Sequence, residues 1–325
     1  YPLQWLLYSF TQIPYLTYLL KIPQHVVKDA GVFLRDKLDM DGTLLNSKDK
    51  ISPKTKDALI ECQKNGIKIV LASGRNYGRI KPYLEELHLE EFGGLLIEIN
   101  GIAIYDMSTN QRTILRQMHE DEVRPVFSYL MNLNAESIAV YDEGLFDYMP
   151  DHILTMKQKL RLSLDLPEDY PWTAGAWSWF WDMRNGYPCQ KYIEKVEEID
   201  CPINKFQILQ ETDILNEIEE KLIHKYGDHF EVFRTTPRQI EMGPKGYTKG
   251  DTLVRLMKNF GWSKDEVFVF GDGGNDISMF KQTNYSFAMG QALESVKNEA
   301  KYITLSNDED GIYEALMKFN VIKGV

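Results

Sequence analysis

The sequence is poor in cysteine. It has only three among its 325 residues, at Cys62, Cys189 and Cys201. Their odd number argues against a disulfide framework, and their spacing matches no zinc site. Cysteine usage of this kind is typical of a reducing compartment, so we expect a cytoplasmic protein whose thiols are buried or inert.

Basic residues are also in short supply. The chain has 37 Lys and Arg against 48 Asp and Glu, which gives a formal net charge of −11. A protein that binds nucleic acid through its phosphates needs an excess of positive charge, so we expect no nucleic-acid partner. One phosphate group can still be bound locally, where a metal ion or a lysine reverses the field.

The sequence has no long uninterrupted apolar run. Polar residues and a proline interrupt its most apolar N-terminal stretch, residues 1–20, at Gln4, Ser9, Thr11, Gln12 and Pro14. A spanning helix needs about 20 mostly apolar residues, and a secretory signal needs a basic start and a small-residue cleavage site. We expect an additional helix or tail here, with contact to a membrane surface as the alternative, since aromatic residues favour interfaces.

The remaining composition is that of a globular protein of about two domains. Hydrophobic residues make up 43% and charged residues 26% of the chain. Strand-like and helix-like stretches alternate on both sides of a central segment, which predicts an α/β core, a doubly wound, Rossmann-like parallel sheet with helices on its faces. The predicted strands are 67–72, 95–99, 267–270 and 285–289, and the predicted helices begin at Ser52-Pro53 or span 77–88, 249–260, 275–281 and 309–319.

The central segment, residues 119–235, has a different character and predicts an inserted α+β domain. Its predicted helices are 119–133 and 213–226, and its predicted strands are 137–141, 205–209 and 230–234. Four of the six tryptophans fall within residues 172–181. We expect this aromatic cluster to close the core of the insert, with a substrate-facing loop as the alternative.

The strongest local signal is a pair of carboxylates, Asp39 and Asp41, followed by Gly42. Side chains at i and i+2 of an extended segment point to the same side. At the carboxyl end of a strand they would face the crevice where open α/β sheets bind ligands. One carboxylate can then be a nucleophile and the other a proton donor and acceptor. The alternative is a surface Asp-Gly turn.

Three weaker signals follow other predicted strands or open a helix. Asp272 and Asp276 lie in a glycine-rich turn and offer the carboxylate oxygens that Mg²⁺ prefers, unless the turn only caps a helix. Ser73-Gly74 at a helix start suits a phosphoryl group, although a helix cap explains Ser73 equally well. Lys249 opposes the dipole of the helix it begins, so it is either a ligand for an anion or a solvated surface lysine.

Taken together and in this order, these motifs resemble the haloacid dehalogenase superfamily, and more narrowly its Cof-type members with a class IIB cap. The matching stretches are LDMDGTLL (38–45), VLASGR (70–75), INGIAIYD (99–106), IEMGPKGYTKGDTL (240–253) and FGDGGNDISMF (270–280). The resemblance implies a core of residues 36–118 and 236–325, a cap of residues 119–235, and an N-terminal extension of residues 1–35 without a family counterpart.

The resemblance also implies a mechanism. Asp39 would attack phosphorus to form an aspartyl-phosphate, and Asp41 would protonate the leaving group and then activate water. The implied ligands of Mg²⁺ are Asp39, the backbone carbonyl of Asp41 and Asp272, with Asp276 as a further ligand or as the residue that orients the waters. The implied phosphate-binding residues are Thr43, Ser73, Gly74, Lys249 and Asn275. The substrate would be a small phosphorylated metabolite of the sugar phosphate type, enclosed by the cap.

The strand before Asp39 departs from the family pattern. Arg35, Asp36 and Lys37 put three consecutive charges where a central buried strand is normally apolar. Either these charges lie in a preceding turn and the strand is short, or the support of the nucleophile is impaired.

Two alternatives to a phosphatase stay open. A phosphomutase of the same superfamily would need its aspartyl-phosphate to survive water, and a large cap after the second motif favours the hydrolase instead. A catalytically weak binding or scaffold protein would use the aromatic N-terminus or the cap to hold a partner, but all the catalytic positions are present.

Overall fold

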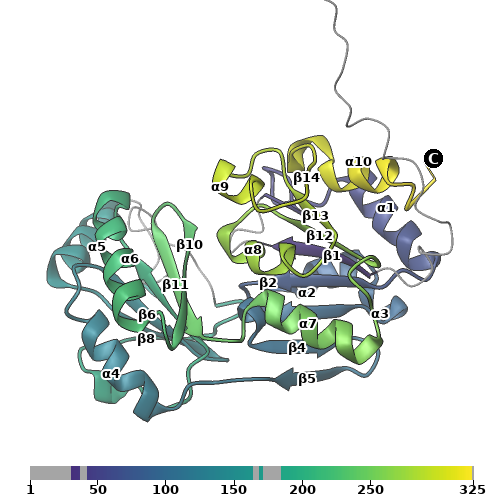
Figure 1. Cartoon of the computed structure of the whole chain (residues 1–325). Coiled ribbons are helices and arrows are strands. Elements are labelled where there is room, and N and C mark those ends of the chain that lie inside the picture. Colours follow the sequence, from purple (N-terminus) through teal and green to yellow (C-terminus); the bar gives the residue numbers. More distant parts are fainter. Residues whose placement is uncertain (1–30, 37–41, 164–167, 171–183, 324–325) are drawn as a thin grey trace, which may run out of the picture.

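The computed structural model describes residues 31–36, 42–163, 168–170 and 184–323 (Figure 1). Asp39 and Asp41, the apolar stretch 1–20 and the tryptophan cluster 172–181 lie outside these residues.

One half of the molecule is built on an eight-stranded sheet in the order β14-β13-β12-β1-β2-β3-β4-β5. The six strands from β14 to β3 pair in parallel, as predicted, and β4 and β5 add an antiparallel hairpin at one edge. The strands are β14 (Tyr302–Ile303), β13 (Tyr285–Ala288), β12 (Val267–Gly271), β1 (Gly31–Asp36), β2 (Ile69–Ser73), β3 (Leu95–Glu98), β4 (Ala103–Asp106) and β5 (Gln111–Ile114).

Helices cover both faces of this sheet, because neighbouring strand residues point to opposite sides. Ile69 and Leu71 pack with α1 (Pro53–Lys64), α2 (Tyr77–Glu86) and α10 (Gly311–Lys318), whereas Val70 and Ala72 pack with α7 (Lys249–Phe260) and α8 (Ile277–Phe280). The predicted doubly wound α/β fold is confirmed. The short helices are α3 (Leu89–Phe92), α9 (Glu294–Lys297), η2 (Ile99–Gly101), η4 (Gly274–Asp276) and η5 (Asn307–Glu309).

The strand β1 occupies the centre of the sheet and contains two of the three charges that break the family pattern. Arg35 and Asp36 pair along β2 with Ala72 and Ser73, so they do not lie in a preceding turn. The ladder with β12 spans only Gly31–Phe33, and both charges therefore lie beyond it at the end of the strand. The first described strand starts at Gly31, inside the predicted N-terminal extension.

The other half of the molecule is a six-stranded sheet in the order β10-β11-β9-β6-β7-β8. The strands are β10 (Phe230–Thr236), β11 (Gln239–Pro244), β9 (Lys205–Leu209), β6 (Glu136–Val140), β7 (Gly144–Tyr148) and β8 (Cys189–Tyr192). Helices α4 (Glu120–Leu130) and α6 (Thr212–Tyr226) pack on one face of it. Helix α5 (Asp151–Ser163) and the turn η3 (Val196–Glu198) complete this part, which Figure 1 shows beside the first sheet.

The second sheet extends past residue 235, where the predicted insert ends. Strand β11 pairs antiparallel with both β10 and β9, and its Ile240 and Met242 are buried beneath the helices. We use the name cap below for this sheet with α4, α5 and α6, and core for the eight-stranded sheet with its helices. The division of the whole chain into domains stays a prediction.

The structure also bears on the expected state of the thiols and on the presence of a membrane-spanning helix. All three cysteines are described and free. Cys62 is buried, and this burial raises the pKa of its thiol to about 12, whereas Cys189 is exposed. Within the described ranges, no helix has the length and apolar character that crossing a membrane requires.

Candidate active site

The predicted site residues meet at one edge of the core sheet. Ser73 is the last residue of β2, and Asp272 directly follows β12. These parallel strands flank β1, so their carboxyl ends lie at the same edge, where open α/β sheets bind ligands. Lys249 reaches this edge from the first turn of α7, and its Nζ donates to the carbonyl oxygen of Ala72 at 3.1 Å. Its side chain is buried, so the alternative of a solvated surface lysine is wrong.

The first and last motifs are in direct contact. The hydroxyl of Thr43 donates to Oδ1 of Asp272 at 2.9 Å. Gly42 has φ of +125°, and a Cβ placed on it would lie 2.4 Å from Oδ2 of Asp272. Only glycine fits this backbone and this close approach. The segment that directly follows Asp41 therefore lies against Asp272.

Asp276 shapes the loop that carries Asp272. Its Oδ2 accepts hydrogen bonds from the backbone N–H groups of Asp272, at 3.1 Å, and of Gly273, at 3.0 Å. Its side chain is fully buried. One oxygen of Asp276 is thus engaged in holding the loop that carries Asp272.

Ser73 has its own place in the loop between β2 and α2. Its Oγ accepts a hydrogen bond from the backbone N–H of Arg75 at 3.0 Å. The helix cap that could have explained Ser73 is Asn76 instead, whose Oδ1 accepts from the N–H of Arg79. Capping is therefore not the reason for a buried serine at the end of β2.

The described part of the predicted metal site consists of two carboxylates. Asp272 and Asp276 supply hard oxygen donors of the kind that Mg²⁺ prefers, next to the Gly42 backbone that leaves room for the Asp272 carboxylate. The described residues contain no group of three or more His, Cys, Asp or Glu that could hold a metal. The other two predicted ligands, Asp39 and Asp41, precede Gly42 and lie outside the described residues. The donors present fit a hard cation.

A cavity of about 410 Å³ lies between core and cap. Lys249 and Asn275 line it from the core, and Glu231, Val232 and Phe233 line it from strand β10 of the cap. Its volume lies within the range of small-molecule sites, about 300–1,000 Å³. The cavity has both charged and aromatic walls.

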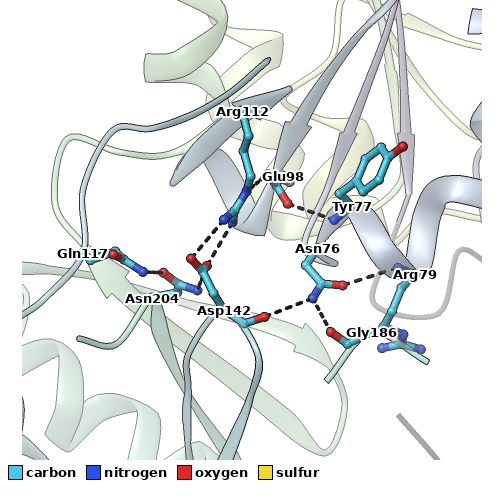
Figure 2. Close-up of polar contacts among 9 residues, drawn as sticks. All are labelled: Asn76, Tyr77, Arg79, Glu98, Arg112, Gln117, Asp142, Gly186 and Asn204. Atoms are coloured by element: carbon cyan, nitrogen blue, oxygen red, sulfur yellow. Dashed lines mark hydrogen bonds and ion pairs between the residues drawn. The ribbon is translucent and has the colours of Figure 1, made fainter. Parts of the chain in front are cut away.

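Arg112 joins core and cap at one side of the site (Figure 2). Its Nη1 and Nη2 each lie 2.9 Å from a carboxylate oxygen of Asp142 in the cap, and its Nε donates to Glu98 at the end of β3. The second oxygen of Glu98 accepts from the backbone N–H of Tyr77 at 2.8 Å. Asn204 adds a hydrogen bond to Asp142 at 2.9 Å.

The charges of this junction shift one another's pKa values. Burial raises the pKa of Glu98, and Arg112 opposes but does not cancel that rise. Burial also acts to raise the pKa of Asp142, but hydrogen bonds from Arg112 and Asn204 outweigh it and lower that pKa. The guanidinium therefore pairs with two carboxylates, one of them fully buried.

Several residues that the sequence did not reveal connect the site to the cap. Asn100 follows β3 and precedes Gly101, and an Asn-Gly pair is typical of an ordinary turn. Lys205 and Glu241 alternate with apolar residues along cap strands, a pattern that equally fits a solvent-exposed sheet face. Arg112 lies in a hairpin that was not predicted. No local signal distinguishes these residues from ordinary polar surface residues.

Comparison with known proteins gives four findings. Residues 37–316 match the haloacid dehalogenase-like hydrolase family. The 5-amino-6-(5-phospho-D-ribitylamino)uracil phosphatase YwtE of Bacillus subtilis is 29% identical over 292 residues, which cover 85% of this chain and 94% of that protein. A solved haloacid dehalogenase-like hydrolase from Bacteroides thetaiotaomicron is 30% identical, with a TM-score of 0.66 and coverage of 90% of this chain and 99% of that one. A solved HAD subclass IIB sugar phosphatase has the same fold at 24% identity, with a TM-score of 0.68 and coverage of 90% and 100%.

Proposed function

The chain belongs to the haloacid dehalogenase-like hydrolases, as its motifs predicted, and from this we propose that it is a Mg²⁺-dependent phosphatase of small phosphorylated metabolites, with sugar phosphates as the substrate class. The observation that carries the proposal is the meeting of Ser73, Lys249 and Asp272 at the carboxyl edge of β2 and β12. A buried cation, a hydroxyl and a carboxylate at one sheet edge suit a phosphoryl group and its metal ion.

The proposed reaction has two steps. In the first, the carboxylate of Asp39 attacks phosphorus, the bond between phosphorus and the leaving oxygen breaks, and Asp41 gives that oxygen a proton. In the second, Asp41 takes a proton from water, which attacks the aspartyl-phosphate, releases inorganic phosphate and restores Asp39. The contact of Gly42 and Thr43 with Asp272 supports this assignment, because it brings the segment after Asp41 to the same edge.

The other residues would bind and neutralise the phosphoryl group. Ser73, Gly74 and Asn275 would donate hydrogen bonds to its oxygens, and the Lys249 ammonium would stabilise the charge that develops on them. Asp39, the backbone carbonyl of Asp41 and Asp272 would hold Mg²⁺, with Asp276 orienting the loop of Asp272. The metal ion, when bound, supplies Lewis-acid stabilisation of phosphoryl charge.

The substrate class is proposed from the cavity and the relatives. A cavity of about 410 Å³ suits a leaving group of a few rings or a short chain. Glu231 offers acceptors for hydroxyl groups, and Phe233 offers an apolar face. The chain shares its fold with a solved HAD subclass IIB sugar phosphatase.

The experiment that tests the proposal measures phosphate release from an aryl phosphate and from a panel of sugar phosphates, with Mg²⁺ and with a chelator. We expect metal-dependent release by the full chain and none by Asp39→Asn, with both proteins equally folded by circular dichroism. Phosphate release that persists in Asp39→Asn would overturn the nucleophile assignment. Absence of release from every substrate would overturn the phosphatase itself.

A further inference from the structure

Polar side chains are buried on the face of the cap sheet that points toward the core. Along β9, Phe206 and Ile208 pack under the cap helices, so Lys205 and Gln207 lie on the opposite face. Along β11, Glu241 is the cross-strand partner of Gln207 and shares that face. The side chains of Lys205 and Glu241 are 3% and 1% exposed. A buried charge is costly unless it is paired, so each of these charged groups is expected to have partners within the structure.

The carboxylate of Glu241 gathers donors from cap and core. Its Oε1 lies 2.6 Å from Nζ of Lys205 and accepts from Gln207 at 2.9 Å. Its Oε2 accepts a hydrogen bond from the side-chain amide of Asn100, which belongs to the core. An ionised carboxylate is an acceptor at both oxygens, so it fixes the amide of Asn100 with the nitrogen toward the cap.

Asn100 connects Glu241 with the proposed phosphate site. It lies in η2 with φ of 58°, a left-handed conformation that asparagine tolerates better than most residues. Since its nitrogen faces Glu241, its Oδ1 faces the core and accepts from Nδ2 of Asn275 at 3.0 Å. The same Oδ1 would lie 3.2 Å from a Cβ placed on Gly74, so the amide also lies against the loop after β2.

Lys205 also contacts the loop after β2. Its Nζ donates to the carbonyl oxygen of Gly74 at 2.9 Å while it pairs with Glu241. Two loops of the proposed phosphate site are thus held by one cap carboxylate, through Asn100 on one side and through Lys205 on the other. Figure 2 shows a second cap contact nearby, where Asn76 donates to the carbonyl oxygen of Gly186 at 2.6 Å.

We propose that Glu241 is a positioning residue of the phosphate site, which couples the seating of the cap to the geometry of the Gly74 and Asn275 loops. The proposal rests on the proposed function, because it takes these loops to bind phosphate. Glu241 does not touch the substrate; it acts through Asn100 and Lys205.

Replacing Glu241 by glutamine keeps the size of the side chain but changes its hydrogen-bonding groups, and this change should break the coupling. The glutamine side chain has one acceptor oxygen and one donor nitrogen. Either Asn100 or Lys205 then faces a donor, so one of the two loops loses its hold. We expect the affinity for inorganic phosphate and kcat/KM to fall about 10- to 100-fold, as when outer partners of a site's ligands are removed.

The control variant breaks an equally buried ion pair elsewhere in the cap. Lys157 and Glu136 are 2.6 Å apart, and both side chains are fully buried. Glu136 lies on the same sheet face as Glu241 but at the far end of β6. Glu136→Gln should lower thermal stability about as much as Glu241→Gln and leave phosphate affinity unchanged.

The experiment uses the full chain and two readouts. Calorimetric titration with inorganic phosphate in the presence of Mg²⁺ measures the site, and amide hydrogen exchange measures the loops without any need for activity. Exchange at residues 73–76 and 274–276 should rise in Glu241→Gln and stay as in the wild type in Glu136→Gln. Equal exchange in the two variants would overturn the coupling, even for an active phosphatase. A wild type that neither binds phosphate nor releases it would overturn the proposed function, while the exchange result would still decide the coupling.

A second variant covers the case in which Glu241→Gln does not fold. Asn100→Gly removes the amide, tolerates the left-handed backbone and leaves the Lys205–Glu241 pair intact. Exchange at residues 274–276 should rise, and phosphate affinity should fall. Wild-type exchange and affinity in Asn100→Gly would contradict the proposal.

Discussion

Replacement of Arg112 by methionine removes the guanidinium that joins core and cap while keeping an unbranched side chain. Glu98, whose side chain is fully buried, would lose its ion pair and keep the hydrogen bond from the Tyr77 backbone. Removing one partner of a buried pair costs about 3–5 kcal/mol. The Asp142 carboxylate is 29% exposed, so loss of the Arg112–Asp142 pair should lower the free energy of unfolding by an amount nearer to the roughly 0.2–1 kcal/mol of exposed pairs. Because Glu98 can take up a proton instead, we expect a loss of about 3 kcal/mol at pH 7.

The pH dependence of this loss follows from the direction of the pKa shifts. Burial raises the folded-state pKa of Glu98 above its ordinary value of 4.5, so its contribution to stability falls as pH rises through that folded pKa. Without Arg112 the pKa rises further and the fall is larger. The pKa of Asp142 is lowered in the folded protein, so its stabilising share is present above the ordinary value and lost as pH falls through the folded one. The pKa shifts of Glu98 and Asp142 both make the stability lost in Arg112→Met largest near neutral pH and smaller toward pH 4.

Urea unfolding of wild type and variant at pH 7 and pH 5 measures this difference. Arg116 is the matched control, since it is a neighbouring arginine whose pair with Glu122 is 30% and 40% exposed. Arg116→Met should cost about 0.5 kcal/mol at either pH. The reasoning is refuted if Arg112→Met costs no more than Arg116→Met, or if its cost grows as the pH falls.

Three further outcomes are expected. Gly42→Ala should lose most activity, because its Cβ would press on Asp272. The positive φ at this position should by itself cost about 1–3 kcal/mol of stability. The control Gly243→Ala, with no atom within 4 Å of its Cβ, should behave as wild type in the same assays. Lys249→Met should lower kcat about 10²- to 10³-fold, as removal of one charge-stabilising donor does, and a wild-type kcat would place the phosphoryl group elsewhere. Asp272→Asn should raise the Mg²⁺ concentration for half-maximal activity about tenfold or more, and an unchanged titration would remove Asp272 from the metal site.

Local signals account for the parts of the fold that could be predicted. Helix α7 begins and ends at the predicted residues, because Thr248 caps it and Gly261 ends it in the left-handed conformation. Helix α5 was missed because only Ile153 and Lys157 of its described side chains are buried, which leaves no apolar stripe. The β4–β5 hairpin was missed because both strands are only four residues long and β5 is largely polar and exposed.

The site could be predicted as far as topology decides it. Motifs that follow parallel strands must meet at one sheet edge, as Ser73 and Asp272 do. Lys249 reaches the same edge from the start of α7. The contacts of Glu241 and Arg112 could not be predicted, because they depend on how the cap lies on the core. Such contacts join residues far apart in the chain, and a charged residue within a strand gives no sign of which surface will cover it.

The most direct test of the central claim is to look for the phosphoryl group on Asp39. The Asp41→Asn variant should accumulate it with an aryl phosphate, because a good leaving group needs no proton while hydrolysis of the aspartyl-phosphate needs the base. Acid quench followed by peptide mass spectrometry should find one hydroxylamine-labile phosphoryl group on the peptide that contains Asp39, and none in Asp39→Asn. A phosphatase that turns over with no phosphoryl group on this peptide, or with the group on another residue, would contradict the account.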